Sequence, residues 1–107
     1  MKISWPIYIR DKEGREIYLT EERWKHALRH TGMSEALLPK VLATVRTGNR
    51  KADEYDPAKF KYIRSFRELP SNFTHLIVVV KFGIMPQHPD KENNFVLTAY
   101  LINRNLR

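Results

Sequence analysis

The sequence predicts an α+β fold, with an N-terminal hairpin and two helices packed on one face of a small antiparallel sheet. Three observations predict it: a glycine-containing turn between two short alternating segments, two stretches with helical spacing, and three later runs rich in β-branched and aromatic residues. Because these runs follow the helices instead of alternating with them, the sheet should be antiparallel with its helices on one side. We expect a single domain over residues 1–107, since so short a chain closes only one core.

The first two elements are a hairpin within residues 5–19 and a helix over residues 21–31. Gly14 supplies the positive φ that a tight turn between the two strands needs. Thr20 is a favourable N-cap, and the two glutamates after it suit the positive end of the helix dipole. Gly32 then ends the helix.

A second, amphipathic helix is predicted after Ser34, which is another candidate N-cap. Apolar residues recur there at three- and four-residue intervals, namely Leu37, Leu38, Val41, Leu42 and Val45. Pro39 disturbs the first turns, so the regular helix begins either at Ser34 or near Pro39. Gly48 ends it within the basic stretch 46–51, and residues 52–59 are predicted to be loop.

Three strands are predicted at residues 60–66, 75–82 and 95–102, with a long hairpin loop over 83–94. Period-two alternation separates an apolar set that should face the helices: Leu76, Val78, Val80, Phe82, Phe95, Leu97, Ala99 and Leu101. Thr98, Tyr100 and Lys81, with His75, then share the opposite and more open face.

Alternation in the 60–66 strand puts Arg64 on one side with three aromatic residues. An arginine in this position can stack on the aromatic rings and still reach an anion. It can equally extend its charged end to solvent at a sheet edge. The sequence leaves both interpretations open.

The composition favours a polyanionic partner and excludes several kinds of site. The chain carries 19 Lys and Arg against 12 Asp and Glu, a net charge of +7, which favours RNA, DNA or an acidic protein. It contains no cysteine, which excludes disulfides, thiolate zinc sites and a cysteine nucleophile. We expect a cytoplasmic protein that does not enter a membrane, because the longest apolar run, residues 76–80, is far shorter than a membrane span.

Two histidines four residues apart are the leading candidates for chemistry. His26 and His30 would project from one face of the first helix, about one turn apart. Histidine titrates near neutral pH, so a pair of them among cations suggests acid–base chemistry on an anionic substrate. Surface histidines without chemistry are the alternative, and a metal site would need further ligands that this segment does not offer.

A histidine-bearing helix, an amphipathic helix, a strand with an arginine, an apolar strand and a closing strand with Thr98 and Tyr100 follow one another over residues 17–103. In this order the chain resembles small members of the barnase–EndoU–colicin–RelE nuclease superfamily, especially phage-associated domains and BrnT-type toxins. The resemblance implies a RelE/EndoU-like fold and a metal-independent ribonuclease, in which the ribose 2′-OH attacks the adjacent phosphate. It also implies the toxin of a toxin–antitoxin system, with RNA as substrate, a cognate antitoxin protein as partner and no cofactor.

Carried over position by position, the resemblance assigns His26 and His30 as candidate general base and acid, and Arg64 as a phosphate clamp. Thr98 and Tyr100 match the polar pair of the closing strand, which orients or stabilises the phosphate. BrnT-like chains commonly have an arginine where Tyr100 stands, so this chain is nearer the phage-type and EndoU-like branch.

Position and charge add Arg46 and Lys81 as substrate-binding candidates. An alternative function is a non-catalytic RNA- or DNA-binding module, in which exposed Tyr62 and Tyr100 stack on bases while cations contact phosphates. A homodimer is compatible with either function.

Overall fold

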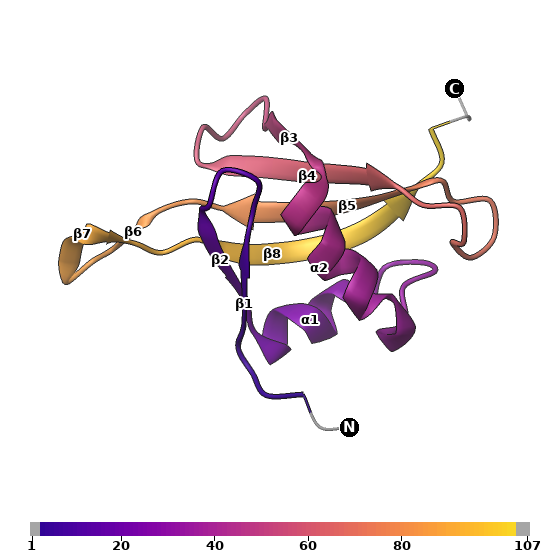
Figure 1. The fold of residues 1–107 in the computed structure, drawn as a ribbon, viewed down its shortest axis with the longest axis horizontal. Coiled ribbons are helices and arrows are strands. Elements are labelled where there is room, and N and C mark those ends of the chain that lie inside the picture. The colour runs from indigo at the N-terminus through magenta and orange to yellow at the C-terminus, as the bar shows by residue number, and fades with distance from the viewer. Residues whose placement is uncertain (1–2, 105–107) are drawn as a thin grey trace.

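The structure, a computed structural model that describes residues 3–104, confirms the α+β class (Figure 1). A six-stranded sheet has the spatial order β1-β2-β8-β5-β4-β3. Its strands are β1 (Ile7–Arg10), β2 (Glu16–Leu19), β3 (Asn49–Ala52), β4 (Lys59–Ser65), β5 (His75–Lys81) and β8 (Phe95–Ile102). The helices are α1 (Glu21–Ala27), a short 3-10 helix η1 (Glu35–Leu37), and α2 (Leu38–Thr47). Among residues 3–104, no helix has both the length and the apolar composition required to cross a bilayer.

The N-terminal hairpin belongs to the sheet and not to the layer that covers it, which corrects the predicted arrangement. β2 pairs with β8 in parallel where Tyr18 lies opposite Phe95, so the sheet is mixed. Asn94, just before β8, secures this junction: its carbonyl accepts from the Tyr18 amide at 3.0 Å, and its side chain donates to the Glu16 carbonyl at 3.0 Å. The hairpin turn itself is as predicted, with Gly14 at φ 82°.

Helix α1 begins where the sequence indicates but ends sooner. The Thr20 hydroxyl accepts a hydrogen bond from the Arg23 amide at 3.2 Å, which confirms the N-cap. The helix stops at Ala27 instead of residue 31, so His30 lies in the turn that follows. Gly32 has a φ of 83°, and a Cβ there would lie 2.8 Å from the Phe73 ring. Gly32 therefore has a left-handed backbone conformation, and the turn around it is tightly packed.

The second helical stretch divides at its start. Ser34 makes no side-chain cap, and only η1 forms before α2 begins at Leu38, with Pro39 in the first turn of α2 where a proline is tolerated. α2 buries Val41 and Val45 against β4 and β5. Of the two predicted starts, the one near Pro39 is the start of the regular helix.

Strands β4, β5 and β8 agree with the predicted strands to within one residue, but the structure also has strands in two regions where none was predicted. β3 is an edge strand that pairs with β4, and β6 (Ile84–Met85) and β7 (His88–Glu92) form a separate hairpin that projects beyond the sheet (Figure 1). β3 is short and polar, so it lacks the β-branched signal. Gly48 allows the sharp change from α2 to β3, since a Cβ there would collide with the Thr44 carbonyl oxygen.

A register shift in β8 corrects the predicted apolar face. Leu76, Val78 and Val80 face the helices as predicted, and so do Ala99 and Leu101. Between Val79 and Val80 the pairing slips by one residue, so that Val80 lies opposite Val96. Val96 therefore enters the core instead of Phe95 and Leu97, because one extra residue reverses the faces of a strand.

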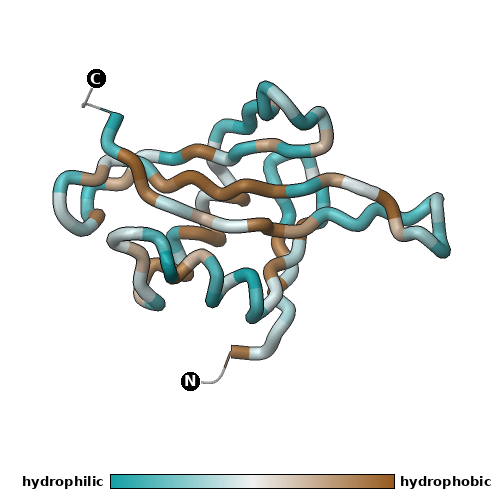
Figure 2. The backbone as a smooth tube through the Cα atoms, turned by 180° about the vertical axis from the view of Figure 1, so that it is seen from behind, coloured by the Kyte–Doolittle hydropathy of each residue, from teal (hydrophilic) through white to brown (hydrophobic). Residues whose placement is uncertain are grey.

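The sheet face turned away from α2 is called the open face here. Figure 2 shows the central strands from this side, without a helix across them. Cross-strand register assigns three rows of residues to this face, because directly opposed residues point to the same side. The rows are Thr98–Val79–Lys61–Lys51, then Tyr100–Ile77–Ile63–Asn49, then Ile102–His75–Ser65.

Candidate functional site

Four of the candidate residues come together at one edge of the open face. The His30 Nε2 and the Thr98 Oγ1 are hydrogen-bonded at 3.1 Å, although the residues are 68 positions apart in the chain. The His30 ring centroid lies 5.7 Å from that of Tyr100 and 5.9 Å from that of His26. We call these four residues the imidazole cluster.

The topology explains why a helical segment reaches this face. β2 pairs with β8 at Phe95 alone, and the chain then turns into α1, which packs on β8 beyond that point (Figure 1). α1 buries Trp24 and Ala27 and leaves His26 exposed. The turn after α1 then carries His30 round the β8 edge to Thr98. The two histidines are neighbours, as the spacing predicted, but through a helix and a turn and not through one helix face.

The cluster has the elements required for proton transfer. The half-buried His30 ring is held by a hydroxyl that can donate or accept, so its tautomer follows the direction of that hydrogen bond. His26 is exposed and lines a surface hollow of about 350 Å³ together with Arg23, Lys25 and Arg29. One carboxylate, Glu22, also lines this hollow. The His26 imidazole and three cations are therefore accessible to an anionic ligand, with the half-buried His30 ring beside them.

Arg64 is not brought to this cluster. Its register partner is Leu76, which faces the helices, so Arg64 lies on the other side of the sheet from Thr98 and Tyr100. Its Nη1 donates to the Thr47 Oγ1 at 3.0 Å at the end of α2, and its guanidinium lies 4.7 Å from the Phe66 ring centroid. Of the two interpretations that the sequence left open, the structure shows the stacking on an aromatic ring. Arg64 and the closing-strand pair therefore do not lie together, because alternation in β4 directs the arginine side chain to the helical side.

The weaker candidates also lie apart from the cluster. Lys81 is on the open face as predicted, but its Nζ is 2.6 Å from the Asp56 carboxylate, which neutralises it locally. Arg46 is exposed in the last turn of α2, on the covered side of the sheet. Tyr62 is only 1% exposed, so the prediction that it stacks on bases is wrong.

Tyr62 belongs instead to a buried polar network that ties the N-terminal hairpin to β4. The Tyr62 hydroxyl donates to the Asp11 carboxylate at 2.6 Å, and the Arg15 Nη1 donates to the same carboxylate at 3.0 Å. The Arg50 Nε donates to the Tyr62 oxygen at 3.2 Å, and the Arg50 guanidinium stacks on Phe60 at 3.4 Å. Each charge in this network has a partner.

The network shifts the acidities of its members. Burial acts to raise the pKa of Asp11, but hydrogen bonds from Tyr62 and from the Arg15 and Glu13 amides outweigh it, so the pKa lies below its ordinary value. Burial and the hydrogen bond to Asp11 raise the pKa of Tyr62. The carboxylate is therefore held ionised and the phenol neutral, as a structural tie requires.

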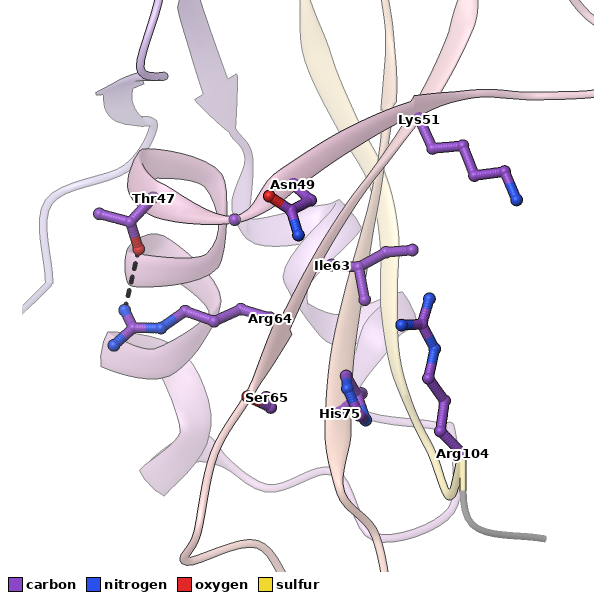
Figure 3. A pocket seen from close by; sticks show the side chains of 9 residues that line it. Thr47, Asn49, Lys51, Ile63, Arg64, Ser65, His75 and Arg104 are labelled. Atoms are coloured by element: carbon purple, nitrogen blue, oxygen red, sulfur yellow. Dashed lines mark hydrogen bonds between the residues drawn. The ribbon is translucent and has the colours of Figure 1, made fainter.

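The sequence analysis missed a basic groove at the other side of the open face (Figure 3). It has a volume of about 520 Å³, and its polar lining includes Thr47, Asn49, Lys51, Ser65, His75 and Arg104. Figure 3 shows Arg64 at its border, directed towards Thr47 and away from Lys51 and Arg104. β3, for which the sequence predicted no strand, brings Lys51 beside β4. No motif in the sequence connects Lys51 to Arg104.

Comparisons with protein-family models, with curated proteins and with solved structures find no significant match to this chain. Within residues 3–104, no group of three or more His, Cys, Asp or Glu side chains is close enough together to hold a metal ion.

Proposed function

We propose that the protein is a metal-independent ribonuclease whose active centre is the imidazole cluster. The observation that carries the proposal is the 3.1 Å contact between His30 and Thr98, with the His26 and Tyr100 rings beside it. Four residues selected for phosphodiester chemistry thus come from two distant segments and meet at one accessible edge. A net charge of +7 supports a polyanionic substrate.

The proposed reaction needs one proton acceptor and one proton donor. One imidazole of the pair His26 and His30 removes the proton of the ribose 2′-OH, and the 2′-oxygen forms a bond to phosphorus. The bond to the 5′-oxygen breaks, and the other imidazole gives its proton to that oxygen. The products are a 2′,3′-cyclic phosphate and a free 5′-OH end. Thr98 orients the His30 ring, and Tyr100 lies where its phenol can contact the phosphate.

Charge stabilisation is reassigned within this proposal. Arg64 hydrogen-bonds Thr47 on the helical side of the sheet, so we do not include it in the active centre. Arg23, Lys25 and Arg29 share the hollow of His26 and are the cations best suited to the phosphoryl oxygens. A RelE/EndoU-like fold, membership of the nuclease superfamily that the sequence resembles, and a toxin's role with an antitoxin partner are parts of the same proposal.

The test is cleavage of single-stranded RNA by the purified chain and by His30→Ala. General acid–base groups contribute roughly 10²- to 10⁴-fold, so we expect His30→Ala to lose at least about 100-fold in rate. His26→Ala should lose a similar factor, and the pH dependence should be bell-shaped. His88→Ala is the matched control, because His88 is exposed in the projecting hairpin. Thermal melting checks that each variant is folded.

Two results would contradict the proposal. One is RNA that stays intact with the unmodified chain, and the other is equal cleavage by that chain and by the double variant His26→Ala/His30→Ala. RNA that is bound but never cleaved would favour the non-catalytic binding module instead, for which the basic groove is the supporting feature.

A further inference from the structure

The basic groove differs in charge from other hollows of the surface. Three cations line it, Lys51, Arg104 and Arg64, of which Arg64 is directed towards Thr47. The rest of the polar lining is His75 with neutral hydroxyl and amide groups, and no carboxylate lines it. Four other hollows within residues 3–104 each include at least one Asp or Glu. The groove is therefore suited to an anion to a degree that those hollows are not.

The cations of the groove are not neutralised by ion pairs. Between residues 3 and 104 the ion pairs join Arg10 to Glu16, Arg15 to Asp11, Lys25 to Glu21 and Lys81 to Asp56, all outside the groove. Lys51 and Arg104 are both exposed. Their charges are available to a ligand.

One side of the groove is built by hydrogen bonds at the end of the sheet. The Thr74 hydroxyl accepts from the Arg104 amide at 3.0 Å and contacts the His75 Nδ1 at 2.7 Å. This holds Arg104 beside His75. Burial, and then the positive charge of Arg104, lower the pKa of His75.

The groove and the imidazole cluster lie on the same face of the sheet. In the first row of the open face, Thr98 and Lys51 are separated by Val79 and Lys61, which is about 14 Å at the usual spacing of neighbouring strands. Val79 and Ile77 are buried between them and form an apolar floor. A flexible strand crossing the sheet could contact both ends at once.

We propose that the basic groove binds the phosphate backbone of single-stranded RNA, on one side of the bond that the imidazole cluster cleaves. This inference rests on the proposed function for its substrate, and it assigns the groove a positioning role. Phosphate contacts typically come from Lys and Arg together with Ser, Thr and Asn. Lys51, Arg104, Ser65, Thr47 and Asn49 provide this combination.

The experiment measures binding separately from cleavage. The probe is a labelled 2′-O-methyl RNA of about 12 nucleotides, a length within the usual site sizes of single-strand binding folds, which lacks the nucleophilic hydroxyl. Fluorescence anisotropy over a range of salt concentrations compares the unmodified chain with Lys51→Gln/Arg104→Gln. The matched control is Lys12→Gln/Lys91→Gln, which also removes two exposed charges, but from the N-terminal hairpin and the projecting hairpin.

We expect the groove variant to bind RNA about tenfold more weakly near physiological salt. The plot of log association constant against log salt concentration should become shallower, with its negative slope reduced in magnitude by about 1.4. The control should change both values far less. In cleavage assays the groove variant should raise KM for the long RNA and leave the cleavage of a dinucleotide unchanged, because a dinucleotide cannot reach the groove.

Equal weakening by the groove and control variants would overturn the proposal, since only net charge would then matter. Polyglutamate that competes as well as RNA would also overturn it in favour of an acidic protein partner. If the chain never cleaves RNA but the groove variant still loses RNA binding, the proposed binding role of the groove is supported and the proposed ribonuclease activity is contradicted. If cleavage requires His30 but RNA binding does not change when Lys51 and Arg104 are substituted, the ribonuclease proposal is supported and the groove proposal is contradicted.

Discussion

The Asp11–Tyr62 network and the imidazole cluster both join segments that are far apart in the chain through polar contacts. They differ in how completely their polar groups are hydrogen-bonded within the protein. The Asp11 carboxylate accepts four hydrogen bonds, and its side chain is only 2% exposed. His30 is half-buried, it contacts Thr98 through one ring nitrogen, and the His26 ring beside it is exposed. A buried charge must have partners, so saturation marks a structural site, whereas an accessible histidine pair keeps capacity for a ligand.

Asp11→Ala gives the sharpest test of this difference and the largest expected loss of stability. The substitution leaves the Tyr62 hydroxyl, the Arg15 guanidinium and two amides without their acceptor, so we expect about 3 kcal/mol of destabilisation in urea unfolding. RNA cleavage per folded molecule should not change. If the Asp11→Ala variant had normal stability but no longer cleaved RNA, Asp11 would have a functional and not a structural role.

Gly32→Ala should affect both stability and the imidazole cluster. The φ of 83° disfavours alanine, and the new Cβ would crowd Phe73 and Leu101, so we expect about 2 kcal/mol of destabilisation. Because the same turn carries His30, cleavage by the folded variant should also fall. Gly14→Ala is the matched control: its φ is 82°, but nothing lies within 4 Å of its Cβ. It should lose only the conformational part, about 1 kcal/mol, and cleave normally. Equal losses in the two variants would show that the turn is not tightly packed.

The smallest expected effect is on the acid side of the stability curve. The folded pKa of Asp11 lies below the unfolded value, so its stabilisation is present above the ordinary aspartate pKa, about 4. It is lost as the pH falls through the folded pKa. Tyr62→Phe removes one hydrogen bond that lowers this pKa, so the acid limb should move to higher pH and stability at pH 7 should fall by about 1 kcal/mol.

The control for this measurement is Tyr100→Phe, which removes a phenol from the open face and leaves Asp11 untouched. Urea unfolding followed as a function of pH should show no shift of its acid limb. An acid limb that is unchanged in Tyr62→Phe would mean that the network does not determine the acid stability.

The strands and helices with strong periodicity were predictable, whereas the weakly patterned ones were not. β4, β5 and β8 combine β-branched and aromatic residues with alternation, so their positions follow from local preference. β3 has four residues with exposed or half-buried side chains, and it forms because β4 offers a partner. Alternation also failed in β8 before Thr98, since a register shift is decided by the pairing of two strands and cannot be detected in the sequence of either strand alone.

The candidate site shows the same division. Residue chemistry and order were enough to select His26, His30, Thr98 and Tyr100, which do lie together. They also selected Arg64, which belongs to the opposite side of the sheet, and they overlooked Lys51 and Arg104. Charge and residue type can be read from a chain, but the face on which a side chain emerges depends on register.

By itself, the sequence determined the α+β class, the principal strands, the start of α1 and a basic chain with paired histidines. These features depend on local steric preference, periodicity and composition, which act within a few residues. Only the tertiary structure decided that the hairpin extends the sheet through β2 and β8, that Tyr62 is buried on Asp11, and that Thr98 meets His30. Each of these is a contact between residues more than 50 positions apart, and it exists because the whole core fixes the two segments at once.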